Sequence, residues 1–114
     1  MAKVEIIRSL FDEIQKRFKG ESHKIIDLLE TLEANPRKGK FLSSVGGIVL
    51  KEIRYNAFRF YFITDGEKLR VLDRESLASL LIKFIRMSDK KSQQKEIDEI
   101  KKILLTIGAE GFNL

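Results

Sequence analysis

The amino-acid sequence predicts an α+β fold in which an antiparallel sheet packs against an N-terminal helical hairpin and a C-terminal helix. Two patterns predict this class. Apolar residues recur at spacings of three and four, as on one face of a helix, over residues 9–34 and again over residues 92–107. Aromatic and polar side chains alternate, as in a strand, over residues 58–62. The predicted order of elements is β-α-α-β-β-β-α, with the helical hairpin before an antiparallel meander.

Length and composition describe one domain. With 114 residues, 43% of them hydrophobic and 34% charged, the chain is long enough for one core and too short for two. We assign a single domain to residues 1–114, with a core at about 3–105 and a tail at 109–114. No apolar run approaches the roughly 20 residues of a membrane span, and no signal-peptide pattern opens the chain. The absence of cysteine excludes disulfides and thiolate chemistry, and we expect a cytoplasmic protein without membrane contact.

The N-terminal third reads as a strand followed by two helices. The strand covers residues 3–8, and Ser9 is placed to cap the first helix. The second helix starts at residue 21 or 22, with Ser22 as its N-cap, and runs to residue 34. Asn35 and Pro36 end it, because a residue before proline is pushed out of the α region.

Residues 46–64 predict a hairpin that organises the rest of the chain. A basic loop at residues 37–40 and a flexible point at Gly46–Gly47 precede it, and its strands meet at the polar turn of residues 55–57. In the second strand, alternate side chains share a face: Phe58, Phe60 and Phe62 on one, and Arg59, Tyr61 and Ile63 on the other. The phenylalanines would anchor a core, and the opposite face would suit a phosphate-rich ligand, with Arg54 of the first strand beside Arg59.

The C-terminal half adds strands and a covering helix. A short strand is predicted at residues 68–72 and a longer one at residues 80–86. A helix over residues 77–87 competes with the latter, but β-branched and aromatic residues favour the strand. The last helix begins at Ser88 or Ser92, and Gly108 closes it. Its apolar stripe consists of Ile97, Ile100, Ile103, Leu104 and Ile107.

The net charge and the absence of several known motifs limit the classes of function that are compatible with the sequence. The net charge of +5, from 22 basic and 17 acidic residues, favours an anionic partner. His23 is the only histidine and has no other ligand-type residues clustered around it, so we expect no metal site and no Ser–His or Cys–His nucleophile. There is no glycine-rich phosphate loop of known type, and we expect no cofactor.

Basic residues and one tyrosine remain for chemistry on the sheet. RNA carries its own nucleophile, the 2′-hydroxyl, so a site needs only to align it, neutralise charge on the phosphate and move protons. Arginine and lysine supply the charge, and tyrosine or a lysine of lowered pKa can transfer the proton. In a meander the following groups could converge: Arg54, Arg59, Tyr61, Arg86, Lys90 and Lys91. The plainer interpretation is solvated charge at strand ends, or an ion pair of Glu52 with Arg54 or Arg59.

In order and spacing, the chain resembles the RelE/ParE toxin superfamily, nearest its HigB-like, phage-type branch, over about residues 3–105. The resemblance rests on the element order and on four motifs: Leu32-x2-Asn35-Pro36-x2-Gly39-Lys40, Lys51–Glu52–Ile53–Arg54, Phe58–Arg59–Phe60–Tyr61–Phe62, and Phe84 followed by Lys90–Lys91–Ser92–Gln93. It implies that the chain is the toxin of a type II toxin–antitoxin pair. Such a toxin cuts ribosome-bound mRNA and is bound by a cognate antitoxin.

The resemblance also implies roles for single residues. Arg59 matches the family's arginine after the hairpin turn, which contacts the scissile phosphate, and Arg86 is similar to the arginine near the end of the last strand. RelE itself has lysines where this chain has Leu50 and Glu52, which leaves proton transfer to Lys51 or Tyr61. The implied set is catalytic Arg59, Arg86, Lys51 and Tyr61, with Arg54, Lys90 and Lys91 binding RNA.

Three functions therefore follow as alternatives. The first is a ribosome-dependent mRNA endonuclease, and the second is a non-catalytic binding protein of the same fold, such as a gyrase-type inhibitor or a degenerate toxin. The third is a basic RNA-binding module without toxicity. The nuclease requires Arg59 to lie near Arg86 and Lys90, with its guanidinium free of a purely internal pairing. The sequence predicts neither the oligomeric state nor a codon preference.

Overall fold

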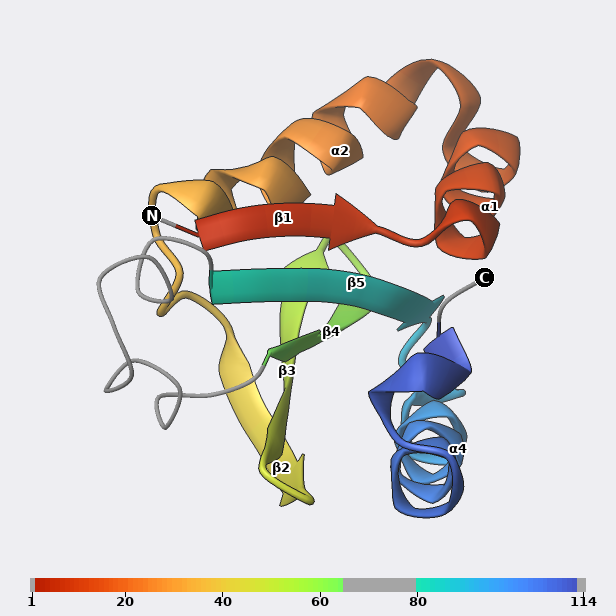
Figure 1. Cartoon of the computed structure of the whole chain (residues 1–114). Coiled ribbons are helices and arrows are strands. Elements are labelled where there is room, and N and C mark those ends of the chain that lie inside the picture. The colour runs from red at the N-terminus through yellow and green to blue at the C-terminus, as the bar shows by residue number, and fades with distance from the viewer. Residues whose placement is uncertain (1, 65–79, 113–114) are drawn as a thin grey trace.

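The computed structural model describes residues 2–64 and 80–112 of the chain (Figure 1). Its helices and strands are β1 (Ala2–Ile6), α1 (Arg8–Phe18), α2 (Ser22–Glu30), β2 (Lys40–Val45), β3 (Ile48–Tyr55), β4 (Phe58–Thr64), β5 (Leu80–Ser88) and α4 (Gln93–Thr106). Short 3₁₀ turns follow the three helices: η1 (Lys19–Glu21), η2 (Thr31–Glu33) and η4 (Ala109–Phe112). The predicted α+β class is confirmed.

The five strands form one mixed sheet in the order β1-β5-β4-β3-β2. Strands β2 to β5 pair antiparallel with their neighbours, as predicted. The prediction of an antiparallel sheet is wrong for β1, which pairs parallel with β5 from Ala2↔Leu80 to Ile6↔Phe84. Parallel strands need a long connection, and everything from α1 to β4 lies between these two in the sequence. A pairing between such distant segments leaves no local pattern in the sequence.

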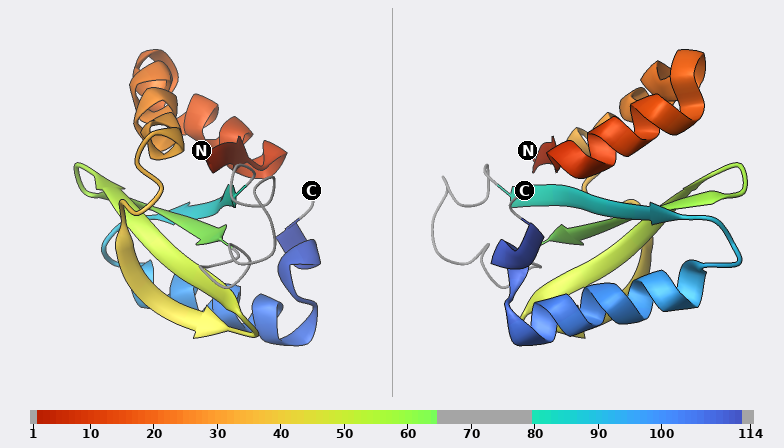
Figure 2. Two further views of the ribbon diagram at one scale, coloured as in Figure 1. Left: turned by 60° about the vertical axis from the view of Figure 1, so that its left-hand side comes forward. Right: turned by 90° about the vertical axis from the view of Figure 1, so that its right-hand side faces the viewer.

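Helices cover both faces of the sheet, so the molecule has three layers (Figure 2). The α1–α2 hairpin lies on one face and α4 lies on the other. On the first face, the Phe18 ring of α1 packs edge-on against Phe58 and lies 6.3 Å from the Phe60 ring. On the second face, Ile100 and Leu104 of α4 are buried. The hairpin and the covering helix both occur where the sequence predicts them.

Strand β4 is buried on both of its faces. Phe60 and Phe62 have no solvent exposure, which confirms their predicted inward direction. Arg59 and Tyr61 point to the other face, where they are also buried, at 6% and 0% exposure. The sequence pattern leaves this second face open to a ligand, but α4 covers it.

The helix starts differ from the predicted caps. Helix α1 begins at Arg8 with the extended Ile7 as its N-cap, so Ser9 lies inside the first turn. Ser22 is the first residue of α2, but its side chain does not cap the helix. Its hydroxyl oxygen lies 2.6 Å from the Lys19 carbonyl oxygen and 3.1 Å from Gln15 Oε1. The chain enters α2 from η1 with a helical backbone, which leaves no extended N-cap position.

Strand β2 was not predicted. Residues 37–40 were interpreted as a basic loop and residues 41–45 were left unassigned, yet Lys40–Val45 pairs antiparallel with β3 and forms one edge of the sheet. Gly46 and Gly47 form the two-residue turn of this hairpin, with φ of 57° and 85°. Positive φ at both central residues is typical of the tight turns that join antiparallel strands. The Gly46–Gly47 pair between Val45 and Ile48 was the available signal.

The C-terminal region confirms two predictions and corrects two. Residues 80–88 form strand β5 and not a helix, and α4 is closed at Gly108, whose φ is 89°. The predicted tail contributes Phe112 to the core at 1% exposure, whereas Ile107, assigned to the apolar stripe, is 63% exposed. Ile107 is the C-cap of α4, and its amide still donates to the Ile103 carbonyl oxygen, but its side chain lies in solvent and not on the buried stripe. The predicted strand at 68–72 lies outside the described residues.

Gly39 gives a prediction for stability. Its φ is 111°, and a Cβ placed there would lie 2.8 Å from Phe62 Cζ and 3.2 Å from the Glu52 carbonyl oxygen. We expect Gly39→Ala to lower the free energy of unfolding by about 1–3 kcal/mol through backbone strain and this clash. Gly20→Ala is the matched control, because no atom would lie within 4 Å of its Cβ. Urea denaturation of both variants checks this, and equal losses would contradict it.

Candidate functional site

Neighbouring strands bring five polar side chains together on the sheet face beneath α4. Residues opposite each other in an antiparallel pair point to the same face. The register pairs Tyr61 with Glu52 of β3 and with Arg86 of β5, and it pairs Arg59 with Ser88. We call Glu52, Arg59, Tyr61, Arg86 and Ser88 the covered polar cluster. Arg86 is half-buried and the other four are buried.

Arg59 and Glu52 form a buried ion pair that falls short of a hydrogen bond. Arg59 Nε lies 3.9 Å from Glu52 Oε2, beyond hydrogen-bonding distance. Neither atom has a hydrogen-bond partner among the described residues. Arg59 Nη1 donates to the Ala57 carbonyl oxygen at 3.0 Å. Of the two ion pairs that the sequence left open for Glu52, the one with Arg59 is therefore confirmed.

Tyr61 lies at the centre of the cluster as a protonated phenol. Its hydroxyl shares a hydrogen bond of 2.6 Å with Ser88 Oγ. Burial raises the pKa of Tyr61, and the nearby Glu52 charge raises it further, while the hydrogen bond with Ser88 and the charge of Arg59 act in the opposite direction. At neutral pH the phenol therefore keeps its proton and is available as a donor.

Helix α4 adds polar groups of its own above the cluster. Gln93 Nε2, in the first turn, donates to Glu52 Oε1 at a long 3.4 Å. Glu96, one turn further on, lies near Arg86: burial raises the pKa of Glu96, and the Arg86 charge opposes that shift. The Arg86 guanidinium carbon lies 5.8 Å from the centre of the Phe112 ring. The cluster is therefore enclosed between the sheet and the C-terminal segment.

Lys51 does not join the cluster. It follows Leu50 and precedes Glu52 in β3, and successive strand residues point to opposite faces. Its Nζ donates to the Arg37 carbonyl oxygen at 3.0 Å and lies 5.9 Å from the centre of the Phe62 ring, on the α1–α2 side. Burial lowers the pKa of Lys51. The sequence assigned it to the same site as Arg59, but the structure separates the two by the thickness of the sheet.

The three residues assigned to RNA binding are exposed near one end of the cluster. Arg54 lies opposite Arg59 in the register, and Lys90 and Lys91 follow two and three positions after Ser88, the other partner of Arg59. The loop that carries the lysines is held by a hydrogen bond of 2.8 Å from the Ser92 amide to Asp89 Oδ1. That bond is the main reason why the pKa of Asp89 is lowered. Arg54, Lys90 and Lys91 are therefore accessible to a large anion.

Arg59 does not meet the requirement stated for a nuclease. Its guanidinium is buried, and its observed partners, Glu52 and Ala57, belong to the protein itself. Arg86 and Ser88 are its neighbours on the same face, as the sequence predicted for Arg86. In the described arrangement Arg59 is only 6% exposed, so a phosphate does not reach its guanidinium. Helix α4 lies on this face of the sheet (Figure 2).

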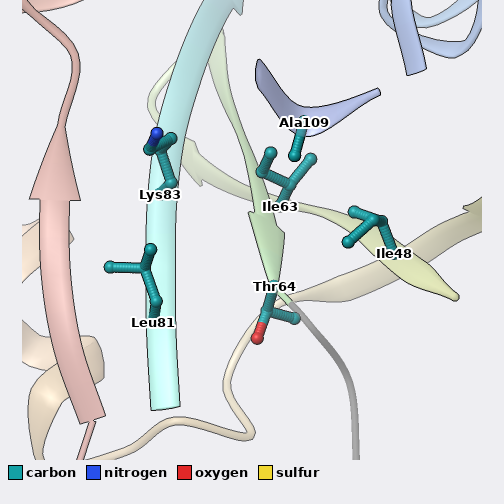
Figure 3. A pocket seen from close by; sticks show the side chains of 6 residues that line it. All are labelled: Ile48, Ile63, Thr64, Leu81, Lys83 and Ala109. Carbon is teal, nitrogen blue, oxygen red and sulfur yellow. The ribbon is translucent and has the colours of Figure 1, made fainter. Parts of the chain in front are cut away.

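A small cavity lies further along the same face of the sheet. It has a volume of about 160 Å³ and is lined by Ile48, Ile63, Thr64, Leu81, Lys83 and Ala109 (Figure 3). Lys83 forms an ion pair with Glu5 at 3.8 Å. Most of the lining is aliphatic and Lys83 is paired with Glu5, so this cavity offers a phosphate few donors. It is not part of the candidate site.

Sequence reasoning missed four polar residues that surround Arg59 and Tyr61. Glu52 was considered only as an ion-pair partner, Ser88 only as a helix start, and Gln93 only as part of a motif of the resemblance. Glu96 was given no role beyond the surface of the last helix. Glu52 could have been placed from alternation, since it shares a strand face with Arg54. Gln93 and Glu96 could not, because their contacts depend on where α4 lies in the fold.

The described residues contain no group of three His, Cys, Asp or Glu side chains that could hold a metal ion. No helix in that part of the chain is long and apolar enough to cross a membrane. Comparison with protein-family models, with curated proteins and with solved structures found no match for this chain.

Proposed function

We propose that this chain is the toxin of a type II toxin–antitoxin pair, with a RelE/ParE-type fold, and that it cuts ribosome-bound mRNA without a metal. The observation that carries the proposal is the covered polar cluster. A sheet face that serves packing alone is apolar or fully hydrogen-bonded, yet Arg59 and Glu52 lie buried there with open hydrogen-bonding atoms. The exposed cations Arg54, Lys90 and Lys91 lie near one end of this cluster.

The cluster holds the groups that RNA cleavage needs. Arg59 and Arg86 neutralise charge that develops on the phosphate, and Tyr61, whose pKa is raised, donates a proton to the leaving oxygen. The exposed cations bind the RNA backbone and bring the strand to the site. Lys51 has no part in this proposal, because it lies on the other face of the sheet. The enzyme works in the cytoplasm without a cofactor, and a cognate antitoxin holds it inactive.

RNA reaches Arg59 when the first turns of α4 leave the sheet. The first buried side chain of this helix is Ile100, in its middle, and Leu104 and Phe112 follow. The N-terminal turns contact the sheet through the long hydrogen bond from Gln93 to Glu52 and through Ile97, which is half-buried against the core. Segments with few buried apolar contacts open at low free energy. Opening of these turns leaves the C-terminal half of α4 in the core.

A second function is favoured by the state of Arg59. The Arg59 guanidinium is paired with Glu52 inside the protein, and Lys51 lies on the opposite face of the sheet. Both observations favour a protein that has this fold but no nuclease activity. Such a chain would bind its target, as a gyrase-type inhibitor does, or would be a degenerate toxin. It would arrest growth without RNA cuts, or not at all.

Inducible expression with mapping of mRNA 5′ ends separates these functions. For the nuclease we expect growth arrest, new 5′ ends that depend on translation, and a loss of cleavage of about 100-fold or more in Arg59→Ala. Arg8→Ala, which removes an exposed arginine on the outer surface of α1, should cleave like the wild type. Growth arrest without new 5′ ends, or arrest that persists in Arg59→Ala, would establish the binding protein instead.

Because Arg59 is buried, Arg59→Ala can lose activity through misfolding alone. A second variant therefore tests RNA binding with exposed residues only. The triple variant Arg54→Ala, Lys90→Ala and Lys91→Ala changes only exposed side chains. On single-stranded RNA, each lost phosphate contact should reduce the slope of log affinity against log salt by about 0.7, so the slope should fall by about 2. An unchanged slope would show that these three residues do not contact RNA phosphates.

A further inference from the structure

The edge of the sheet at β2 carries a second group of cations, separate from the covered polar cluster. Residues 34–51 contain four basic side chains and no carboxylate; the basic residues are Arg37, Lys38, Lys40 and Lys51. The first three are exposed and Lys51 is half-buried. A stretch of one sign of charge on the surface attracts an anionic partner.

Phe41 is the exposed end of a row of side chains that crosses the sheet. The register pairs Phe41 with Lys51, Lys51 with Phe62, and Phe62 with Phe84. Residues that lie opposite each other share a face, so the whole row lies on the α1–α2 side. Phe62 and Phe84 have no solvent exposure, but Phe41 is 59% exposed. The row therefore presents an aromatic ring to solvent beside a lysine.

The loop before β2 holds further cations next to this row. It connects η2 to β2 at the edge of the sheet (Figure 1). The Lys38 amide donates to the Asn35 carbonyl oxygen at 3.1 Å, which closes a tight turn, and Lys51 Nζ donates to the Arg37 carbonyl oxygen at 3.0 Å. That bond uses one of the three hydrogens of the ammonium group. Residues 34–38 line an open concave surface of about 440 Å³.

We propose that this edge binds single-stranded nucleic acid, with one base stacked on Phe41. Phosphates that flank this base bind to Arg37, Lys38 and Lys51, and we call these four residues the edge site. Proteins that bind single strands combine cations for the backbone with exposed aromatic rings for the bases. The ring and the cations lie side by side here, as the base and the phosphate of one nucleotide do. The covered polar cluster faces α4 on the other side of the sheet, so the edge site does not depend on whether the chain cuts RNA.

Fluorescence anisotropy of labelled strands tests the stacking contact with the full-length protein. The probes are two DNA strands of equal length, one with bases and one abasic, because DNA lacks the 2′-hydroxyl on which RNA cleavage depends. Phe41→Ala should weaken binding of the strand with bases about 5- to 100-fold and leave binding of the abasic strand unchanged. Phe11→Ala removes a ring that is 37% exposed on α1, and this control should bind both strands like the wild type.

Phe41→Trp gives a direct signal of stacking. The chain has no tryptophan, so the fluorescence of the new ring reports on this position alone. We expect Phe41→Trp to bind as tightly as the wild type, with emission that is quenched by the strand with bases and not by the abasic strand. Phe11→Trp is the matched control, and its emission should not change with either strand.

The double variant Arg37→Ala with Lys38→Ala tests the phosphate contacts. Each lost contact should reduce the slope of log affinity against log salt by about 0.7, so the slope should fall by about 1.4 for both strands. Lys16→Ala with Lys24→Ala changes two exposed lysines of the helical hairpin and should leave the slope unchanged.

Three results would overturn the edge site. They are no binding of the strand with bases at physiological salt, the same loss for both strands in Phe41→Ala, and no quenching in Phe41→Trp. Quenching that follows protein concentration in the absence of a strand would assign Phe41 to a contact between two copies of the chain instead. Mapping of mRNA 5′ ends measures the nuclease function separately, so either proposal can fail while the other stands.

Discussion

Phe60→Ala is expected to lower the free energy of unfolding by about 3–5 kcal/mol. Phe60 has no solvent exposure and lies in the layer between the sheet and the α1–α2 hairpin, 6.3 Å from the Phe18 ring. Truncation removes the transfer free energy of the ring and leaves a cavity that packed strands and helices fill only in part. A domain of this size has a total stability of about 5–15 kcal/mol, so the variant loses a large share of it.

Phe41→Ala provides the matched control for this prediction. The chemical change is the same, but Phe41 lies on the edge strand β2 and is 59% exposed. We expect its loss to be at most about 1 kcal/mol, since little apolar area is returned to water. Urea denaturation followed by circular dichroism gives both values. Similar losses from the two variants would mean that Phe60 does not anchor the core.

The second large effect is expected from breaking the buried ion pair. Arg59→Met keeps most of the side-chain length but leaves the Glu52 carboxylate buried without a cation, and we expect it to destabilise the protein by about 3–5 kcal/mol. The double variant Glu52→Gln with Arg59→Met has no buried charge at either position. It should therefore be more stable than Arg59→Met alone, although it carries one more substitution.

A double-mutant cycle measures this coupling. The two single variants, the double variant and the wild type are unfolded in urea at one pH, and the interaction energy follows from the four values. Strictly additive losses would show that Glu52 and Arg59 do not interact in solution. Arg8→Met is the surface control, because the Arg8–Asp12 pair is 83% and 63% exposed and should contribute less than about 1 kcal/mol.

These stabilities bear directly on how the cleavage assays are interpreted. If Arg59→Ala is both unstable and inactive, its inactivity alone does not identify a phosphate site. The exposed triple variant at Arg54, Lys90 and Lys91 avoids this difficulty, since it does not disturb the buried cluster. Function and folding can therefore be separated experimentally even at a buried site.

Several features of the molecule could be predicted from the sequence because local patterns determine them. The alternation of Phe58 to Phe62 placed Phe60 and Arg59 on opposite faces, and the turn at residues 55–57 placed Arg54 beside Arg59. Helical periodicity located both helices of the hairpin and α4. Gly108 ended α4 because a positive φ is accessible to glycine at little strain. In each case the physical cause acts within a few residues of the chain.

What the sequence by itself determined, then, is the helical or extended character of the described segments, β2 excepted, and which side chains of a strand share a face. Only the tertiary structure decided that β1 pairs parallel with β5 and that Gln93 of α4 contacts Glu52 above the covered polar cluster. Alternation separates two faces of a strand, but it carries no information on whether water, a ligand or a helix from elsewhere in the chain covers each face. That outcome depends on contacts between distant segments, which form only when the whole core assembles.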